Sequence, residues 1–197
     1  MNYRSFERVF KPFGIVSVSQ VRATKLVFDK NNFGRWEKQG LLIKLKNGYY
    51  AFADIAGTSG FAHYTAGKIY KPSYISLHTA LAFHGIIPKS TNEITSVSSL
   101  KTSTYENSLG TFSYKKIKPS LMFGYDAVEK NGFTFFIASP EKAILDLLYI
   151  YPSYNFKKEI RNLQLDWKKL TTFAKKFEKK VILEKIDSLK NIFIEDI

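Results

Sequence analysis

The stretch that decides the fold is Asp29–Phe52, DKNNFGRWEKQGLLIKLKNGYYAF. Its first half predicts a helix, because Asp29 is a favoured N-cap residue and Gly40 a favoured residue directly after a helix. Its second half predicts a β-hairpin, because Asn47-Gly48 joins two strand-like runs and supplies the positive φ angles of a two-residue type I′ turn. We therefore expect a helix followed directly by a hairpin.

Two shorter helices are expected upstream of this stretch. Apolar residues recur with helical spacing over Tyr3–Phe10, which predicts an amphipathic helix. Ser17 and Gln20 have the spacing of a capping box and predict a second helix that runs through about Ala23. Three helices followed by a hairpin is the element order of a winged helix-turn-helix, which we expect over residues 1–53.

The helix that ends at Gly40 is also the candidate functional element. Phe33 and Trp36 lie on one side of it and are expected to be buried. The other side is polar, and Arg, Asn and Lys are the residue types that bind guanine, adenine and phosphate in the major groove. The hairpin would add contacts to the DNA backbone. The predicted DNA-binding residues are Lys30, Asn31, Asn32, Arg35 and Lys38 of the helix and Lys44, Lys46 and Tyr49 of the hairpin. For the helix alone, a solvated surface without a ligand is the alternative interpretation.

The charge distribution favours a polyanionic partner. The chain has 30 Lys and Arg against 17 Asp and Glu, a net charge of +13. Residues 1–50 hold ten basic and three acidic residues, 51–155 hold nine and seven, and 156–197 hold eleven and seven. A basic N-terminal segment favours DNA, because neutralising phosphates releases condensed counterions. The alternative source of the excess is an AT-rich genome, which favours Lys.

The rest of the chain predicts an α+β domain. Helices are expected from Ser76 to Gly85 and from Ser139-Pro140 onward, since Ser is a favoured N-cap and Pro a favoured first helical residue. A Lys-rich helical pattern follows from Leu165. Strand-like runs between the first two helices predict a small, mainly antiparallel sheet. These runs are Ile94–Leu100, Thr111–Ile117 and Phe133–Ala138, the last preceded by a hairpin at Asn131-Gly132. We therefore expect a winged helix at 1–53, a connector at 54–71 and an α+β domain at 72–197.

Several classes of protein are disfavoured. The chain has no cysteine and no apolar run near the roughly 20 residues of a membrane span, so we expect a cytoplasmic protein without a membrane partner. We expect no metal and no cofactor, because His78 and His84 lie on different sides of one helix. We expect Glu141 to lie at the start of a helix and Asp146 to lie on the surface.

An enzymatic role is not expected. Ser139 and Lys142 have the Ser-x-x-Lys spacing of some serine acylases, but a helix N-cap at Ser139 explains the same residues. No Gly-x-x-x-x-Gly-Lys loop that would bind phosphates is present. A hydrolase that uses Ser139 remains as an open alternative.

Five ordered motifs resemble the AbiEi family of antitoxins. They are RWEKQGLLIKLKNGYY at 35–50, YISLHTALAFHGIIP at 74–88, ITSVS at 94–98, FSYKKIKP at 112–119 and ASPEKAILDLLY at 138–149. The resemblance spans roughly Val16 to Tyr149 and is weakest for the helices from Leu165 to Ile197. Motifs in this order are far more specific than any one of them alone.

The resemblance implies the antitoxin of a type IV toxin–antitoxin system that acts in phage defence by abortive infection. Its partner would be an AbiEii-type nucleotidyltransferase toxin, opposed with or without a stable complex. The N-terminal domain would repress its own operon by binding double-stranded promoter DNA, usually at inverted repeats. The alternative is a winged-helix transcriptional regulator of other genes whose second domain senses a ligand or dimerises.

Overall fold

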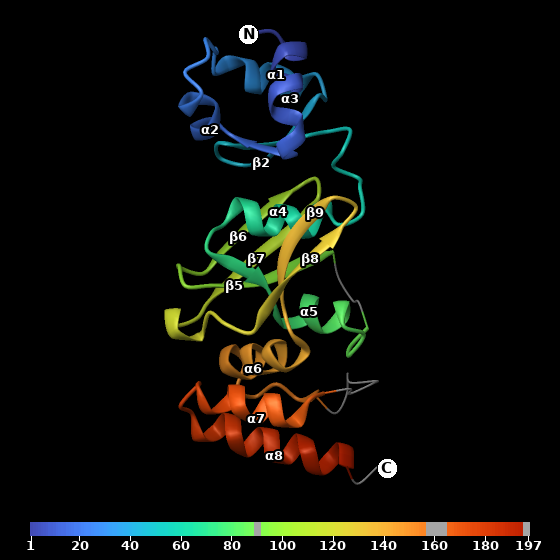
Figure 1. Ribbon diagram of the computed structural model, residues 1–197, viewed down its shortest axis with the longest axis vertical. Coiled ribbons are helices and arrows are strands. Elements are labelled where there is room, and N and C mark those ends of the chain that lie inside the picture. Colours follow the sequence, from blue (N-terminus) through green and yellow to red (C-terminus); the bar gives the residue numbers. More distant parts are fainter. Residues whose placement is uncertain (89–91, 157–164, 195–197) are drawn as a thin grey trace.

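The chain is a mixed α/β protein in the computed structural model, which describes residues 1–88, 92–156 and 165–194 (Figure 1). Within these residues it forms eight α-helices, a three-stranded sheet and a six-stranded sheet. Parts of the expected domain at 72–197 therefore lie outside the described residues. We call the first three helices and the small sheet the N-terminal unit, and the remainder the second unit.

The N-terminal unit consists of a helix, a short strand, two further helices and a closing hairpin. Its sheet has the order β1-β3-β2, and both pairings are antiparallel. The elements are α1 (Tyr3–Phe10), the 3₁₀ turn η1 (Lys11–Phe13), β1 (Ile15–Ser17), α2 (Val18–Ala23), α3 (Asn31–Lys38), β2 (Leu42–Lys46) and β3 (Tyr49–Phe52).

Local capping explains where these helices begin. The Ser17 hydroxyl accepts a hydrogen bond from the Gln20 amide at 3.0 Å and so starts α2, as the sequence predicts. The third helix starts slightly later than expected, at Asn31. Asp29 still takes part, because its carboxylate accepts the Asn31 N–H at 2.9 Å. The helix and the hairpin after it are both present.

The two Asn-Gly turns differ from each other. At Asn131-Gly132 both residues have positive φ, 52° and 80°, as a type I′ turn requires. At Asn47-Gly48 only Gly48 has positive φ, at 76°, so the expected type I′ turn is wrong there. The register between β2 and β3 shifts between Lys44 and Lys46. A bulge of this kind lets a single left-handed glycine close the hairpin.

The second unit is built on the six-stranded sheet, whose order is β6-β7-β5-β4-β9-β8. Three of its five pairings are antiparallel, whereas β5–β7 and β4–β9 are parallel, so the sheet is larger and more mixed than predicted. The elements are α4 (Phe61–Ile69), β4 (Ser73–Ile75), α5 (Leu77–Phe83), β5 (Glu93–Ser98), β6 (Ser103–Asn107), β7 (Gly110–Lys116), the 3₁₀ turn η2 (Pro119–Leu121), β8 (Tyr125–Lys130), β9 (Phe133–Ala138), α6 (Pro140–Ile150), α7 (Trp167–Lys175) and α8 (Lys180–Ile194).

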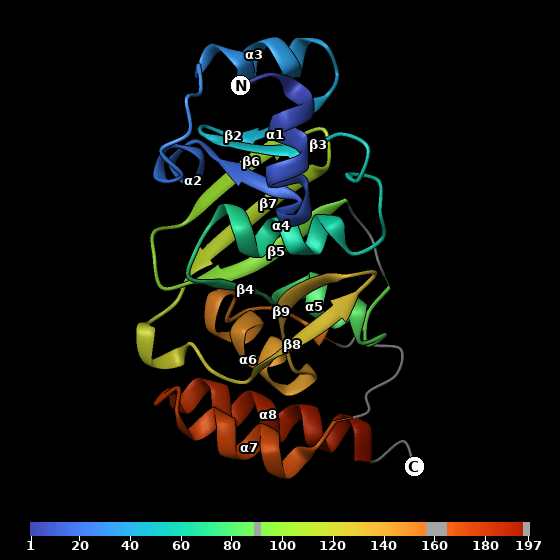
Figure 2. The ribbon, with the colours of Figure 1, turned by 45° about the horizontal axis from the view of Figure 1, so that its top comes forward.

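Helices cover both faces of this sheet (Figures 1 and 2). The segment expected as a connector contains α4, whose Phe61, Ala66 and Ile69 are buried in the core of the second unit. The helices α5 and α6 pack on the other side, and α7 and α8 stack on α6 at the end farthest from the N-terminal unit. As a result α6 has packed neighbours all round.

The small sheet joins the two units. One set of its residues, including Leu42 and Phe52, packs among the N-terminal helices. Another set, including Leu45 and Ala51, belongs to the core of the second unit. The side-chain amide of Asn107 on β6 also donates to the Leu45 carbonyl at 3.0 Å. None of the helices within the described residues combines the length and apolar character of a membrane span.

Candidate nucleic-acid interface

The rotation of α3 is fixed by its aromatic side. Phe33 and Trp36 are only 2% and 4% exposed, as the sequence predicts. The Phe33 ring stacks on Tyr50 of β3 with centroids 4.5 Å apart, and the Trp36 ring lies 4.8 Å from Phe6 of α1. Because these contacts come from two different elements, α3 cannot turn about its axis without breaking one of them.

The opposite side of α3 forms an exposed stripe. Asn31, Arg35 and Lys38 are exposed, and the spacing of these residues places them on one side of the helix together with Gly34. Apart from its chain neighbours and the backbone of α3 itself, no atom lies within 4 Å of the position that a Cβ at Gly34 would occupy. Figure 2 places α3 at the end of the molecule away from the second unit. Because Asn31, Arg35 and Lys38 are exposed, the described chain leaves this side of the helix open.

Gly34 is not among the predicted DNA-binding residues. A residue without a side chain in the middle of the stripe lets another molecule approach the helix backbone closely. The signal was available, because Gly34 falls between Asn31 and Arg35 at helical spacing.

Asn32 is placed differently from the prediction. It is 8% exposed, and its side-chain amide donates to the carbonyl of Met1 at 3.3 Å. The amino group of Met1 in turn donates to the Val27 carbonyl at 3.2 Å. Asn32 therefore faces the start of the chain and ties it to α3, and its side chain is not part of the exposed stripe.

Lys30 and Lys44 extend the exposed positive surface. Lys30 directly precedes α3 and is exposed. Lys44 is exposed on β2 and lies opposite Tyr50 in the sheet. Since paired residues point to the same face and Tyr50 stacks on Phe33, Lys44 lies on the α3 side of the sheet.

Lys46 and Tyr49 point instead toward the second unit. The Lys46 ammonium lies over three tyrosine rings, 4.6 Å from the centroid of Tyr49, 4.9 Å from Tyr105 and 5.7 Å from Tyr70. We call these three rings the tyrosine cage. Burial in it lowers the pKa of the Lys46 side chain. The register shift after Lys44 explains why two lysines of one strand take different sides.

The tip of the β2–β3 hairpin is therefore not free, although the sequence indicated a free tip. The Gly48 carbonyl accepts the backbone N–H of Val18, the first residue of α2, at 2.8 Å. The tip is thus tied to α2, and Tyr49 packs against the core of the second unit. Of the eight predicted DNA-binding residues, five remain exposed: Lys30, Asn31, Arg35, Lys38 and Lys44.

Further exposed cations lie on α1 and α2. Arg4 and Arg8 are exposed on α1, Arg22 is exposed in the last turn of α2, and Lys25 is exposed just after that helix. By contrast, Lys11 forms ion pairs with Glu7 and Asp54. These residues contribute to the charge of residues 1–50, but none of them is among the predicted DNA contacts.

The second unit contains a buried polar cluster that the sequence analysis missed. Lys142 and Asp146 form an ion pair on α6, and both side chains are 0% exposed. The Asp146 carboxylate also accepts the hydroxyls of Tyr74 at 3.0 Å and Ser76 at 2.8 Å. Burial raises the pKa of Asp146 and lowers that of Lys142, while their mutual attraction opposes both shifts. The expected surface position of Asp146 is therefore wrong.

The side chains of Ser139 and Lys142, the Ser-x-x-Lys pair, have different partners in this cluster. Ser139 caps α6 by accepting the Lys142 N–H at 3.3 Å, and its hydroxyl donates to Glu141 at 2.8 Å. The Lys142 ammonium contacts Asp146 instead of the Ser139 hydroxyl. Glu141, which also binds Lys169 of α7 at 3.0 Å, connects the start of α6 to the C-terminal helices.

The histidines have separate surroundings. His84 contacts the Ala138 carbonyl at 2.8 Å, and the His78 ring meets the edge of Tyr154. Within the described part of the chain, no three His, Asp or Glu residues are grouped as metal ligands would be. Comparisons of the chain with protein-family models and with curated proteins return no match.

Proposed function

We propose that the N-terminal unit is a winged helix that binds duplex DNA through α3. The observation that carries this proposal is the stripe Asn31, Gly34, Arg35 and Lys38, which is exposed on a helix of fixed rotation at one end of the molecule. The element order and the pairing of β1 with β3 support it. Arg35 and Asn31 would contact base edges, and Lys30, Lys38 and Lys44 would contact phosphates.

The proposed biological role is that of an antitoxin that represses its own operon. The support for this step is the resemblance of the five motifs to AbiEi antitoxins, in which the partner is an AbiEii-type nucleotidyltransferase toxin. Three of these motifs fall on α5, β5 and α6, at the centre of the second unit. The second unit would therefore oppose the toxin, while the N-terminal unit binds the promoter.

The test of DNA binding is fluorescence anisotropy with a labelled duplex from upstream of the gene and a scrambled duplex of equal length. Arg35→Ala should cost about 1–3 kcal/mol on the promoter duplex alone if Arg35 contacts a base. Lys118→Ala, which removes the same charge from the surface of the second unit, should have no effect. Equal losses on both duplexes would make Arg35 a phosphate contact, and unchanged binding would refute the role of α3.

The antitoxin role has its own test. The full-length Arg35→Ala chain is co-expressed with the product of the adjacent gene, and growth is measured. Rescue of growth by a variant that no longer binds the promoter would assign the two activities to different units. If the wild-type chain does not restore growth, the antitoxin role is wrong even if the chain binds DNA.

A second candidate function is a regulator of other genes whose second unit senses a small molecule. The observation that favours it is a pocket of about 330 Å³ in the second unit, away from α3. An adjacent nucleotidyltransferase gene would favour the antitoxin, and a regulated promoter elsewhere would favour this alternative.

A further inference from the structure

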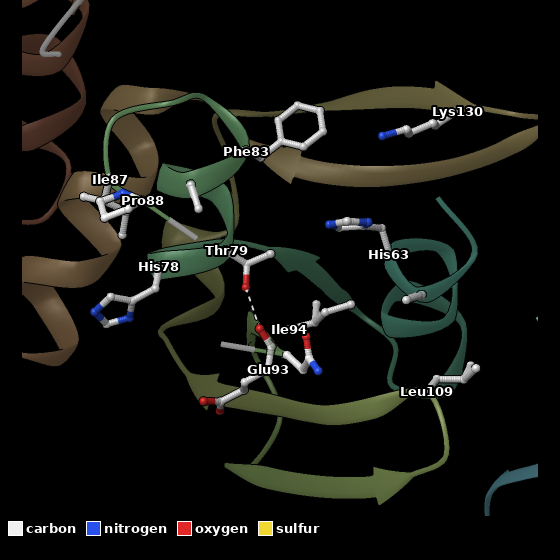
Figure 3. Close-up of a pocket in the computed structure, with 13 residues that line it drawn as sticks. His63, His78, Thr79, Phe83, Ile87, Pro88, Glu93, Ile94, Leu109 and Lys130 are labelled. Atoms are coloured by element: carbon white, nitrogen blue, oxygen red, sulfur yellow. Dashed lines mark hydrogen bonds between the residues drawn. The ribbon is translucent and has the colours of Figure 1, made fainter. Parts of the chain in front are cut away.

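The pocket lies between α4, α5, the start of β5 and the β8–β9 hairpin (Figure 3). Its volume of about 330 Å³ is at the lower end of the roughly 300–1,000 Å³ found for small-molecule sites. A ligand with a single ring is therefore a better match than a nucleotide.

Most of the wall is apolar. Phe83 of α5 is 42% exposed, which is high for a phenylalanine, and it faces this space. Small residues on the two helices, Ala62 and Ala82, keep the space open, and Ile94 and Leu109 line it from the sheet side. The Thr79 hydroxyl is already engaged, since it donates to the Glu93 carbonyl and accepts the Thr95 N–H. The body of a ligand would thus meet mainly apolar surface.

One end of the pocket carries positive and ring-nitrogen groups. Figure 3 shows the Lys130 ammonium and the His63 ring on the side of Phe83 nearest α4, whereas the carboxylate of Glu93 lies beyond Thr79. The His63 ring is oriented by Phe135, on which it stacks with centroids 5.0 Å apart.

The backbone at Lys130 is held in place as well. A Cβ at Gly60 would lie 2.8 Å from the Lys130 carbonyl oxygen, so the hairpin approaches the start of α4 as closely as a glycine allows. The Asn131 side chain next to it donates to the Ser59 carbonyl at 3.1 Å. Lys130 therefore projects from a fixed point at the rim.

From this arrangement we propose that the pocket binds a small organic anion that has one flat apolar ring. The carboxylate lies between Lys130 and His63, and the ring packs against Phe83. A charge-assisted contact orients the ligand, and burial of its ring supplies most of the affinity. Binding at this pocket does not require DNA, so it can be tested separately from recognition by α3.

The experiment uses the full chain, with benzoate as the probe and benzamide as its uncharged counterpart. Binding is followed by amide chemical-shift changes in NMR spectra. Benzoate should shift the amides of Ala62, Ala82, Phe83 and Leu109 in a saturable way, and benzamide should bind several-fold more weakly. Lys130→Met should weaken benzoate about fivefold, because the ammonium is partly solvated. Lys116→Met, which removes an exposed charge outside the pocket, is the matched control.

A steric variant tests the location independently of charge. Ala62→Leu keeps a good helix former in α4 and fills the pocket, so it should abolish the shifts while the circular dichroism spectrum stays unchanged. Equal binding of benzoate and benzamide, or an unchanged affinity in Lys130→Met, would refute the anionic class of ligand. Saturable shifts that persist in Ala62→Leu, or the absence of any shift at millimolar benzoate, would refute the site.

Discussion

Replacing Lys142 by Met should destabilise the protein strongly. The substitution keeps the length of the side chain but leaves the Asp146 carboxylate buried without its cation, and both groups are 0% exposed. Breaking a buried ion pair on one side typically costs about 3–5 kcal/mol. A second estimate gives a similar value. If Asp146 becomes protonated in the variant, protonating a carboxyl of ordinary pKa 3.8 at pH 7 costs about 4 kcal/mol, at 1.36 kcal/mol per pKa unit.

The chain offers a matched control for this prediction. Lys180 and Glu184 on α8 are also four residues apart, but their side chains are 90% and 59% exposed. Lys180→Met should therefore change the free energy of unfolding by less than about 1 kcal/mol. Both variants are measured by urea denaturation followed by circular dichroism, which gives the free energy directly.

Two further measurements separate the electrostatic cause from a simple loss of packing. In Lys142→Met the folded state favours a protonated Asp146, so its raised pKa makes the penalty smaller as the pH falls from 7 toward 4. The double variant Lys142→Met, Asp146→Asn should recover about 2 kcal/mol, because the amide oxygen still accepts from Tyr74 and Ser76. A loss no larger than that of Lys180→Met, or one that is independent of pH, would refute the reasoning.

Three other predictions follow from single contacts. Lys46→Ala should lower the free energy of unfolding by about 1 kcal/mol, because the Lys46 ammonium loses its contacts with the tyrosine cage, and should leave the salt dependence of DNA binding unchanged. Lys44→Ala should instead reduce the salt slope by about one and leave the free energy of unfolding unchanged. Gly34→Ala should stabilise the exposed helix by about 0.5–1 kcal/mol in urea denaturation and still weaken DNA binding, and tighter or equal binding would argue against close approach at that point. Burial raises the pKa of Glu141, but hydrogen bonds from Lys169, Ser139 and the backbone outweigh burial and lower the pKa overall. The ionised Glu141 therefore stabilises the fold above about pH 4.5, and this stabilisation is lost as the pH falls through the lowered pKa. Glu141→Gln should remove this part of the acid sensitivity in denaturation curves measured at successive pH values.

The local features of this protein are determined by the sequence itself. The bounds of the first helix, the Ser17 and Ser139 caps and the buried pair Phe33 and Trp36 all match their predictions, because each depends on residues within about one helical turn. The same short range explains why the exposed stripe of α3 was largely foreseen: burying two aromatic residues fixes where the opposite side points.

Only the tertiary structure decided the positions of Asn32, Lys46 and Asp146. Each depends on a partner distant in the sequence: Met1 for Asn32, Tyr105 for Lys46, and Tyr74 for Asp146. In the sequence Asp146 looks like one polar residue of an amphipathic helix, and α6 buries it because the sheet on one side and α7 and α8 on the other leave no side open to water. Periodicity indicates that a helix has an apolar side, but the number of layers packed around the helix determines whether its polar side is also buried.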